Sequence, residues 1–309
     1  MEKLNLSSSP HIRGKKTVSG IMLDVIVALT PAAAASVIIF GYRAALVMCI
    51  CISTAILSEF FFQKITKSKI LVHDLSACVT GLLLALNLPV SIPLWQAALG
   101  SLFAVVVVKG MFGGIGKNFA NPAITARIMM LIAFTGTMTA YVTPFTDTLT
   151  SSATPLAMLG GDTSALPSLK DMLLGIRAGS MGETCAVALI IGGVYLIFKG
   201  VISYVTPVSY IGTVFILSLI YGGGEFALYQ VLSGGLLLGA FFMATDYATT
   251  PTRPLGKLIF GLGCGIITAA IRFYGSNPEG VSYAILLMNI ITPYIDKWTR
   301  PTPIGGSKK

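Results

Sequence analysis

The stretch LSACVTGLLLALNLPVSIPLWQAALGSLFAVVVV, residues 75–108, holds no charged residue in 34 positions. A helix needs about 20 predominantly apolar residues to cross a bilayer, so this stretch is too long for one span. Pro89 and Pro93 divide it, because proline cannot donate the helical hydrogen bond and disfavours helix in the residue before it. The stretch therefore predicts two membrane helices, about 75–88 and 93–110, of which the first is unusually short.

The composition of the whole chain agrees with this environment. Of 309 residues, 54% are hydrophobic and 11% are charged, whereas a soluble domain carries roughly 25% charged residues. The further candidate spans are about 21–40, 43–62, 122–140, 184–199, 204–221, 227–244, 256–274 and 281–298. The sequence therefore predicts an all-α membrane protein of about ten transmembrane helices, with the lipid bilayer as its main contact.

Lysine and arginine are distributed unevenly between the two sides of these spans. With the N-terminus in the cytoplasm, sixteen basic residues fall on the cytoplasmic side, and Arg127 lies inside the fifth span. Only Arg43, Lys170, Arg177 and Arg272 fall on the other side. This bias predicts an N-in/C-in protein of the cell inner (plasma) membrane. Because the basic residues form short tracts between apolar segments, the net charge of +9 does not indicate a nucleic-acid partner.

An internal repeat is faintly visible at an offset near half the chain. Val-Ala-Leu recurs at 27–29 and 187–189, Gly-Leu-Leu-Leu at 81–84 and 235–238, and Asn-Pro at 121–122 and 277–278. The expected organisation is a tail (1–20), a five-helix repeat (21–140), an extracytoplasmic loop (141–183), a second five-helix repeat (184–298) and a tail (299–309). Five spans per repeat make the two repeats inverted, and short helices at matching positions then mark a binding site. These are spans three and eight, which end near Asn87 and Asp246.

The long loop contains a hydroxyl-rich turn, DTLTSSATPL at 147–156. Its small residues leave room for a bulky group, and the hydroxyl of Thr154 could accept a covalent substituent. A plain solvated loop explains the same residues.

Acidic residues at membrane depth are costly and indicate function. Asp74 has a structural explanation, because it lies at the start of span three, where a helix N-terminus favours an anion. Asp24 and Asp246 are less easily explained as caps, and they are the candidate ion or proton ligands. Interfacial capping remains open for each of them.

No site of a soluble enzyme is present in the sequence. There are two histidines and no HExxH, no GxGxxG follows a strand, and residues 111–118 fail the phosphate-loop pattern GxxxxGK[ST]. The five cysteines lie in or beside apolar runs without CxxC spacing, as packing residues do. We therefore expect no catalytic residue, no metal site and no bound NAD on this chain.

Several motifs along the chain resemble a known family. They are Ser9-Pro10-His11, Asp74-Leu75-Ser76-Ala77, Phe112 to Asn118, Asn121-Pro122-Ala123, Gly182-Glu183-Thr184, Gly239 to Asp246 (GAFFMATD) and Leu287-Met288-Asn289. The sequence resembles the D subunit of the Rnf complex, an ion-translocating ferredoxin:NAD⁺ oxidoreductase. It is also similar to the B subunit of the Na⁺-translocating NADH:quinone oxidoreductase.

The resemblance implies cofactors. A flavin transferase of that family attaches FMN, through its phosphate, to the threonine of an (S/T)GAT motif. The matching positions are Ser151, Ser152, Ala153 and Thr154, with Ser152 in place of glycine and Thr154 as the acceptor. A second, non-covalent flavin (riboflavin) is also implied, and Asn87, Asn118, Asn121 and Asp246 are its candidate contacts near the ends of spans three and eight.

The function that follows is electron transfer across the membrane through two flavins, coupled to Na⁺ or H⁺ transport. Other Rnf subunits, including a second subunit with covalent FMN, are the expected partners. The alternatives are a flavin-free channel or secondary transporter on the same inverted repeat, and a purely structural membrane scaffold.

Overall fold

The computed structural model describes residues 17–145, 153–159, 166–275 and 279–301. Every regular element in these ranges is a helix, which confirms the all-helical class. Four helices are long and apolar enough to cross a membrane: α1 (Val18–Phe40), α2 (Tyr42–Ile65), α10 (Val205–Leu232) and α12 (Pro254–Tyr274). The chain is therefore built as a multi-pass membrane protein.

Shorter helices complete the bundle. The apolar ones are α3 (Ser76–Leu86), α4 (Leu94–Leu102) with its π-helical continuation η2 (Phe103–Gly110), α5 (Pro122–Ala133), α9 (Ala186–Phe198) and α13 (Val281–Trp298). The others are η1 (Val72–Asp74), α6 (Thr135–Met138), α7 (Pro155–Leu159), α8 (Leu169–Leu174), α11 (Leu236–Leu238) and the π-helical η4 (Gly239–Met243).

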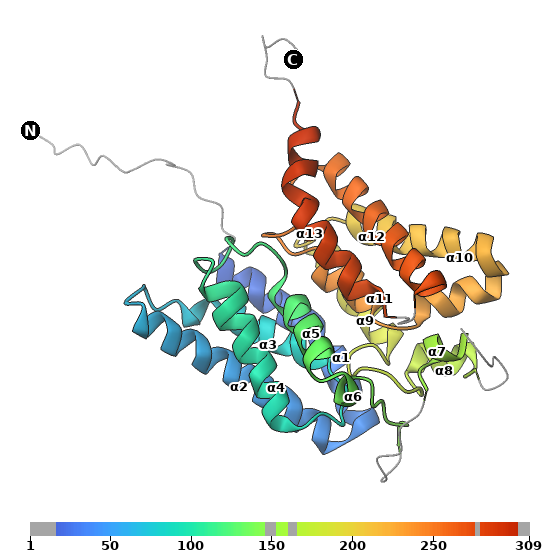
Figure 1. The fold of residues 1–309 in the computed structure, drawn as a ribbon, viewed down its shortest axis with the longest axis horizontal. Coiled ribbons are helices and arrows are strands. Elements are labelled where there is room, and N and C mark those ends of the chain that lie inside the picture. Colours follow the sequence, from blue (N-terminus) through green and yellow to red (C-terminus); the bar gives the residue numbers. More distant parts are fainter. Residues whose placement is uncertain (1–16, 146–152, 160–165, 276–278, 302–309) are drawn as a thin grey trace, which may run out of the picture.

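The helices form two groups that follow the chain. Figure 1 shows α1–α6 on one side and α9–α13 on the other. Helix α2 packs on α3 and α4 in the first group, α10 packs on α12 in the second, and α1 packs on α9 between the groups. The α1–α9 crossing is close, because a Cβ atom at Gly192 would lie 2.1 Å from the carbonyl oxygen of Ala28. Only glycine at position 192 permits this approach.

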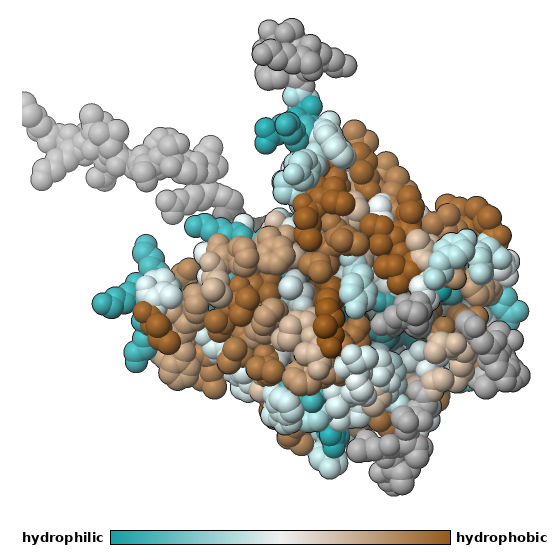
Figure 2. Space-filling view, viewed as in Figure 1, coloured by the Kyte–Doolittle hydropathy of each residue, from teal (hydrophilic) through white to brown (hydrophobic). Residues whose placement is uncertain are grey.

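The outer surface is apolar over wide areas (Figure 2). Ile38, Ile132, Phe198 and Ile220 are all more than 70% exposed although they belong to four different helices. A protein in water rarely exposes contiguous apolar surface of this extent. These side chains are placed to contact lipid.

The two short spans of the sequence are short helices in the structure. Helix α3 ends at Leu86, where the Asn87 N–H closes the last turn. The boundaries 227–244 for span eight were wrong: residues 227–232 extend α10, which is kinked at Gly223 (φ 84°), and α11 begins only at Leu236. A turn through Gly234 (φ 64°) separates them. The expected fifth span is also divided, into α5 and α6, and the loop 141–183 contains α7 and α8.

Candidate functional site

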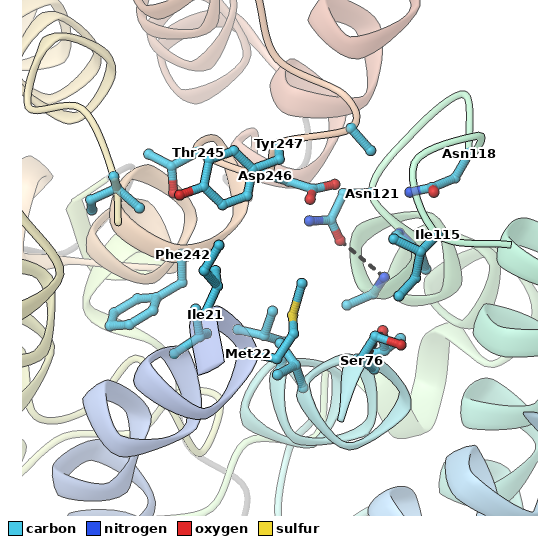
Figure 3. Close-up of a pocket in the computed structure, with 18 of the residues that line it drawn as sticks. Ile21, Met22, Ser76, Ile115, Asn118, Asn121, Phe242, Thr245, Asp246 and Tyr247 are labelled. Carbon is cyan, nitrogen blue, oxygen red and sulfur yellow. Dashed lines mark hydrogen bonds between the residues drawn. The ribbon is translucent and has the colours of Figure 1, made fainter. Parts of the chain in front are cut away.

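A cavity of about 250 Å³ lies between the two groups of helices (Figure 3). Its lining comes from α1, α3, η2, the start of α5 with the segment before it, α9 with the segment after it, and η4 with the segment after it. The lining residues include Ile21, Met22, Val79, Leu83, Ala123, Val201, Phe241 and Phe242 as apolar members, and Ser76, Asn118, Asn121, Thr245 and Asp246 as polar members. Such a mostly apolar pocket with a few polar groups is typical of small-molecule sites, and its volume is near the lower end of their range of about 300–1,000 Å³.

Two polar side chains of this cavity are held by the ends of helices. The Asn121 side chain caps α5, because its Oδ1 accepts hydrogen bonds from the N–H groups of Ala123 (3.0 Å) and Ile124 (3.3 Å). Its Nδ2 donates to the carbonyl oxygen of Met243 at 3.4 Å, which ties α5 to η4. Asp246 accepts from the Thr249 hydroxyl at 3.1 Å. Figure 3 shows Asn121 and Asp246 close together at the same side of the cavity.

A buried ion pair lies beside the cavity. Lys109 Nζ is 2.7 Å from Glu59 Oε1 and donates to the Ser76 hydroxyl at 2.5 Å. Ser76 in turn donates to Asp74, whose carboxylate also accepts the Ser76 N–H at 2.9 Å. Asp74 therefore places its negative charge at the start of α3, as expected from the sequence, although Leu75 occupies the N-cap position. Lys109 lines both the first cavity and a second one of about 430 Å³, which Glu59 also lines. The pair therefore separates two cavities.

Replacing Lys109 by methionine is expected to destabilise the protein by about 3–5 kcal/mol, because Glu59 would be left as a buried carboxylate without its cation. One Glu59 oxygen already has no hydrogen-bond partner. The melting temperature of the purified protein in detergent measures the loss, and adding Glu59→Gln should recover part of it. Lys64→Met, at an exposed position of α2, is the control. Equal melting temperatures for the two methionine variants would contradict the prediction.

A second buried network lies at the other end of α3. Arg127 donates to Asn87 Oδ1 at 2.9 Å and forms ion pairs with Glu183 (3.4 Å) and with Glu279. Tyr141 donates to Glu279 as well. Arg127 comes from α5, Glu183 from the segment before α9 and Glu279 from the segment before α13, so the network joins three distant parts of the chain.

Two more buried arginines belong to this end of the bundle. Arg177 Nη2 donates to the Glu183 carbonyl oxygen at 2.5 Å. Arg272, in the last turn of α12, donates to the carbonyl oxygens of Gln230 (2.6 Å) and Ser233 (3.1 Å) at the end of α10. Both side chains are almost fully buried. We call Arg127, Arg177, Arg272, Glu183 and Glu279 the arginine network.

Thr154 is two residues before Leu156, which borders Gly234 together with Arg272 of the arginine network. It is half-buried, it directly precedes α7, and its hydroxyl oxygen accepts the Ala157 N–H at 3.3 Å. The preceding Ala153 is exposed, while Pro155 and Leu156 are buried. The Thr154 hydroxyl is therefore held by the backbone N–H of Ala157, and its residue is partly exposed to the surroundings.

The structure brings together some of the residues expected from the sequence. Asn118, Asn121 and Asp246 line one cavity, whereas Asn87 accepts from Arg127 of the arginine network and donates to Met243 Sδ at 3.6 Å. Asp24 does not line the cavity. Its carboxylate accepts from the Tyr195 hydroxyl (3.0 Å) and lies 4.0 Å from Lys199 Nζ. Ser151 and Ser152 lie outside the described residues.

Sequence reasoning missed the Lys109–Glu59 pair and the arginine network. Their signals were present: Arg127 falls inside an apolar segment, and Lys109 follows a run of four valines. An ionisable residue in such a place needs a buried partner. The ion-pair partners of Arg127 are 56 and 152 positions away, so no local spacing reveals them.

No group of three or more metal-binding side chains occurs among the described residues. The helices and their apolar exterior are those of a multi-pass membrane protein, with a mostly apolar cavity inside the bundle. Comparison with known proteins then gives its family. The chain belongs to the NQR2, RnfD, RnfE family, whose model matches residues 5–305.

Relatives match along almost their full length. The chain is 48% identical to the D subunit of the Na⁺-translocating ferredoxin:NAD⁺ oxidoreductase complex of Acetobacterium woodii, with 100% of this chain and 98% of the relative covered. It is 43% identical to the D subunit of the proton-translocating ferredoxin:NAD⁺ oxidoreductase complex of Clostridium ljungdahlii (97% and 96% covered). It is 35% identical to the D subunit of the ion-translocating oxidoreductase complex of Halorhodospira halophila (98% and 96% covered). The family resemblance expected from the motifs is confirmed.

Proposed function

We propose that this chain is the flavin-carrying membrane subunit of a redox-driven, ion-translocating ferredoxin:NAD⁺ oxidoreductase. FMN is attached to Thr154, a second flavin (riboflavin) occupies the cavity between the two groups of helices, and electron passage is coupled to Na⁺ or H⁺ transport. The observation that carries the proposal is that Asn118, Asn121 and Asp246, three of the four side chains expected at the second flavin, line one apolar cavity. The names of the relatives support the same activity.

The residues present fit both flavins. At Thr154 the hydroxyl is anchored by Ala157 and flanked by an exposed alanine, as a covalent attachment site requires. At the cavity, the side chains of Phe241, Phe242 and Val79 offer an apolar slot, and Asn121 and Asp246 offer hydrogen-bond partners. When bound, the flavins supply the redox chemistry, which side chains cannot perform. The chain positions them, excludes water and supplies the polar contacts.

We propose the N-in/C-in layout with ten spans in two inverted repeats, in the inner membrane. The start of α1 lines the cavity through Ile21 and Met22. The end of α13 contacts the segment just after the cavity, since Asp296 accepts the Thr252 N–H at 3.2 Å. Both ends of the helical part therefore lie toward the cavity, which supports a cytoplasmic cavity and an extracytoplasmic Thr154.

Asp246 is the better placed of the two candidate ion or proton ligands. It lines the cavity, whereas Asp24 is already beside the ammonium group of Lys199. An anion formed in an apolar cavity needs a nearby counter-charge, because an unpaired buried charge is very costly. We therefore place the coupled cation or proton near Asp246, with Asp24 outside the cavity as a second acidic group.

Flavin fluorescence tests the proposal against a flavin-free transporter. The chain is purified with its complex after co-expression with a flavin transferase, denatured, and viewed on a gel under ultraviolet light. A fluorescent band at the mass of this chain is expected, because a covalent flavin survives denaturation. A dark band would favour the transporter or the structural scaffold.

Filling the cavity tests the second flavin. Val79→Phe should place a ring in the cavity, because Val79 is a buried residue of its lining, and overpacking then excludes a ligand. We expect the non-covalent flavin released by acid to fall from about one per chain to near zero, with the covalent band unchanged. Val187→Phe, at a half-exposed position of α9, should leave both unchanged. Full riboflavin content in the Val79 variant would place the second flavin elsewhere.

A further inference from the structure

The arginine network has an excess of positive charge. Its described members are three arginines and two glutamates, which leaves one positive charge without a counter-charge. Arg272 lies near the ion pairs of Arg127: a Cβ atom at Gly234 would be 3.0 Å from Arg272 Nη2, and one at the next residue, Gly235, would be 3.3 Å from Arg127 Nη1 and 3.9 Å from Glu183 Oε1. Only Arg127 forms ion pairs with the two carboxylates, since neither Arg177 nor Arg272 has a described carboxylate within 4.0 Å. A buried excess charge of this kind requires an anion.

Arg272 is the arginine with hydrogen-bonding capacity left over. A guanidinium has five N–H donors. Arg272 Nη1 uses two of them on Gln230, at the carbonyl oxygen (2.6 Å) and at Oε1 (3.2 Å), and Nη2 uses one on the Ser233 carbonyl oxygen (3.1 Å). The two bonds to carbonyl oxygens cap the C-terminal end of α10. Nε is buried without a partner, so capping does not account for the whole guanidinium.

Arg272 Nη2, which uses only one of its two N–H groups in the bonds above, lies near the segment that follows Thr154. A Cβ atom at Gly234 would be 3.0 Å from Arg272 Nη2 and 3.5 Å from Leu156 Cδ2, so both atoms border the space above this glycine. Leu156 is two residues after Thr154, and its helix α7 packs on α10. Gly234 has a positive φ of 64° and no side chain, so no Cβ atom stands between Arg272 Nη2 and Leu156.

We infer that Arg272 is the cationic partner of a phosphodiester on Thr154, the linkage that the proposed covalent flavin forms. The inference rests on the proposed function and adds a residue that holds the linkage. A phosphodiester carries one negative charge, which balances the one excess positive charge of the arginine network. The planar fork of arginine suits phosphate oxygens better than the point charge of lysine does.

A double-mutant cycle tests the pairing in the assembled complex. The four versions are the wild type, Thr154→Ala, Arg272→Gln and the double variant, and the readouts are melting temperature and in-gel fluorescence. Thr154→Ala should lower the melting temperature of the wild type, because Arg272 loses its counter-charge. In the Arg272→Gln background, Thr154→Ala should lower the melting temperature by at least about 3 °C less than it does in the wild type.

Two further variants sharpen the cycle. Arg43 is the matched control, because its guanidinium also donates to carbonyl oxygens, those of Val90 (2.9 Å) and Ser91 (3.1 Å), without a described contact to the Thr154 segment. When Thr154→Ala is added to Arg43→Gln, it should lower the melting temperature as much as it does in the wild type. Arg272→Lys should keep part of the coupling, since it keeps the charge but not the fork. If the Arg272→Gln chain folds but carries no covalent flavin, while the Arg43→Gln chain does, this result also supports the pairing of Arg272 with the linkage.

The results separate the two proposals. If the wild-type band is fluorescent and the melting-temperature shifts of the two single variants add up to that of the double variant, the role of Arg272 is overturned and the proposed function stays intact. A dark wild-type band would remove the proposed function itself. If inorganic phosphate raised the melting temperature of the wild type in an Arg272-dependent manner, the anion site would be open in the native complex, and the assignment to a linkage on Thr154 would be wrong.

Discussion

The Thr154→Ala complex is expected to contain no covalent flavin on this chain and to lose nearly all electron transfer between ferredoxin and NAD⁺. The reason is chemical: alanine has no hydroxyl oxygen to carry the phosphoester. The backbone is expected to tolerate the change, because the Ala157 N–H also donates to the Thr154 carbonyl oxygen at 2.9 Å. In-gel fluorescence and the ferredoxin:NAD⁺ rate of the purified complex measure the two losses.

Thr150→Ala is the matched control, a threonine four positions earlier in the same hydroxyl-rich stretch. It should keep the fluorescent band and the rate. A band that persists in Thr154→Ala and disappears in Thr150→Ala would move the attachment site. A Thr154→Ala complex with the wild-type rate would show that no electron passes through this position.

The second large effect is expected at Arg127. Arg127→Met should destabilise the protein by about 3–5 kcal/mol, the usual cost of breaking a buried ion pair from one side. Here the cost should lie at the upper end, because Glu183 and Glu279 would both lose their nearest cation and Asn87 would lose a donor. The melting temperature of the complex and the yield of assembled complex are the measurements.

Adding Glu279→Gln to Arg127→Met should recover part of the loss, since it removes one of the two stranded carboxylates. Arg43→Met is the control for losing an arginine that bonds only to carbonyl oxygens among the described residues. If Arg127→Met melted within about 1 °C of the wild type, the arginine network would not contribute to stability in the way the structure indicates.

Much of the fold could be predicted because hydrophobic length is a local signal. The boundaries of α1, α2, α12 and α13 follow the apolar segments within a few residues. Span eight could not be delimited, because the turn through Gly234 is flanked by apolar residues on both sides and hydropathy does not fall there. The glycine and serine residues of the turn are nearly neutral in hydropathy, so they do not interrupt the apolar segment in a hydropathy profile.

The site was only partly predictable for a different reason. The predicted repeat and the short helices grouped Asn118, Asn121 and Asp246 with Asn87, and the first three line one cavity whereas Asn87 contacts Arg127. Thr154 owes its assignment to the family motif, since a hydroxyl-rich loop alone fits a solvated turn equally well. The ionic partners of Arg127 depend on which helices pack together, which is a property of the tertiary structure.

The brevity of α3 has an energetic consequence. Leu83 lines the cavity and Asn87 contacts Arg127, so about one helical turn, roughly 6 Å of rise, separates the cavity from a group of charges. Two unit charges about 10 Å apart interact by on the order of 1–2 kcal/mol at an effective permittivity of about 20. Substitution of one charged residue of the arginine network is therefore expected to change the energy of an anion in the cavity, although that residue does not line the cavity.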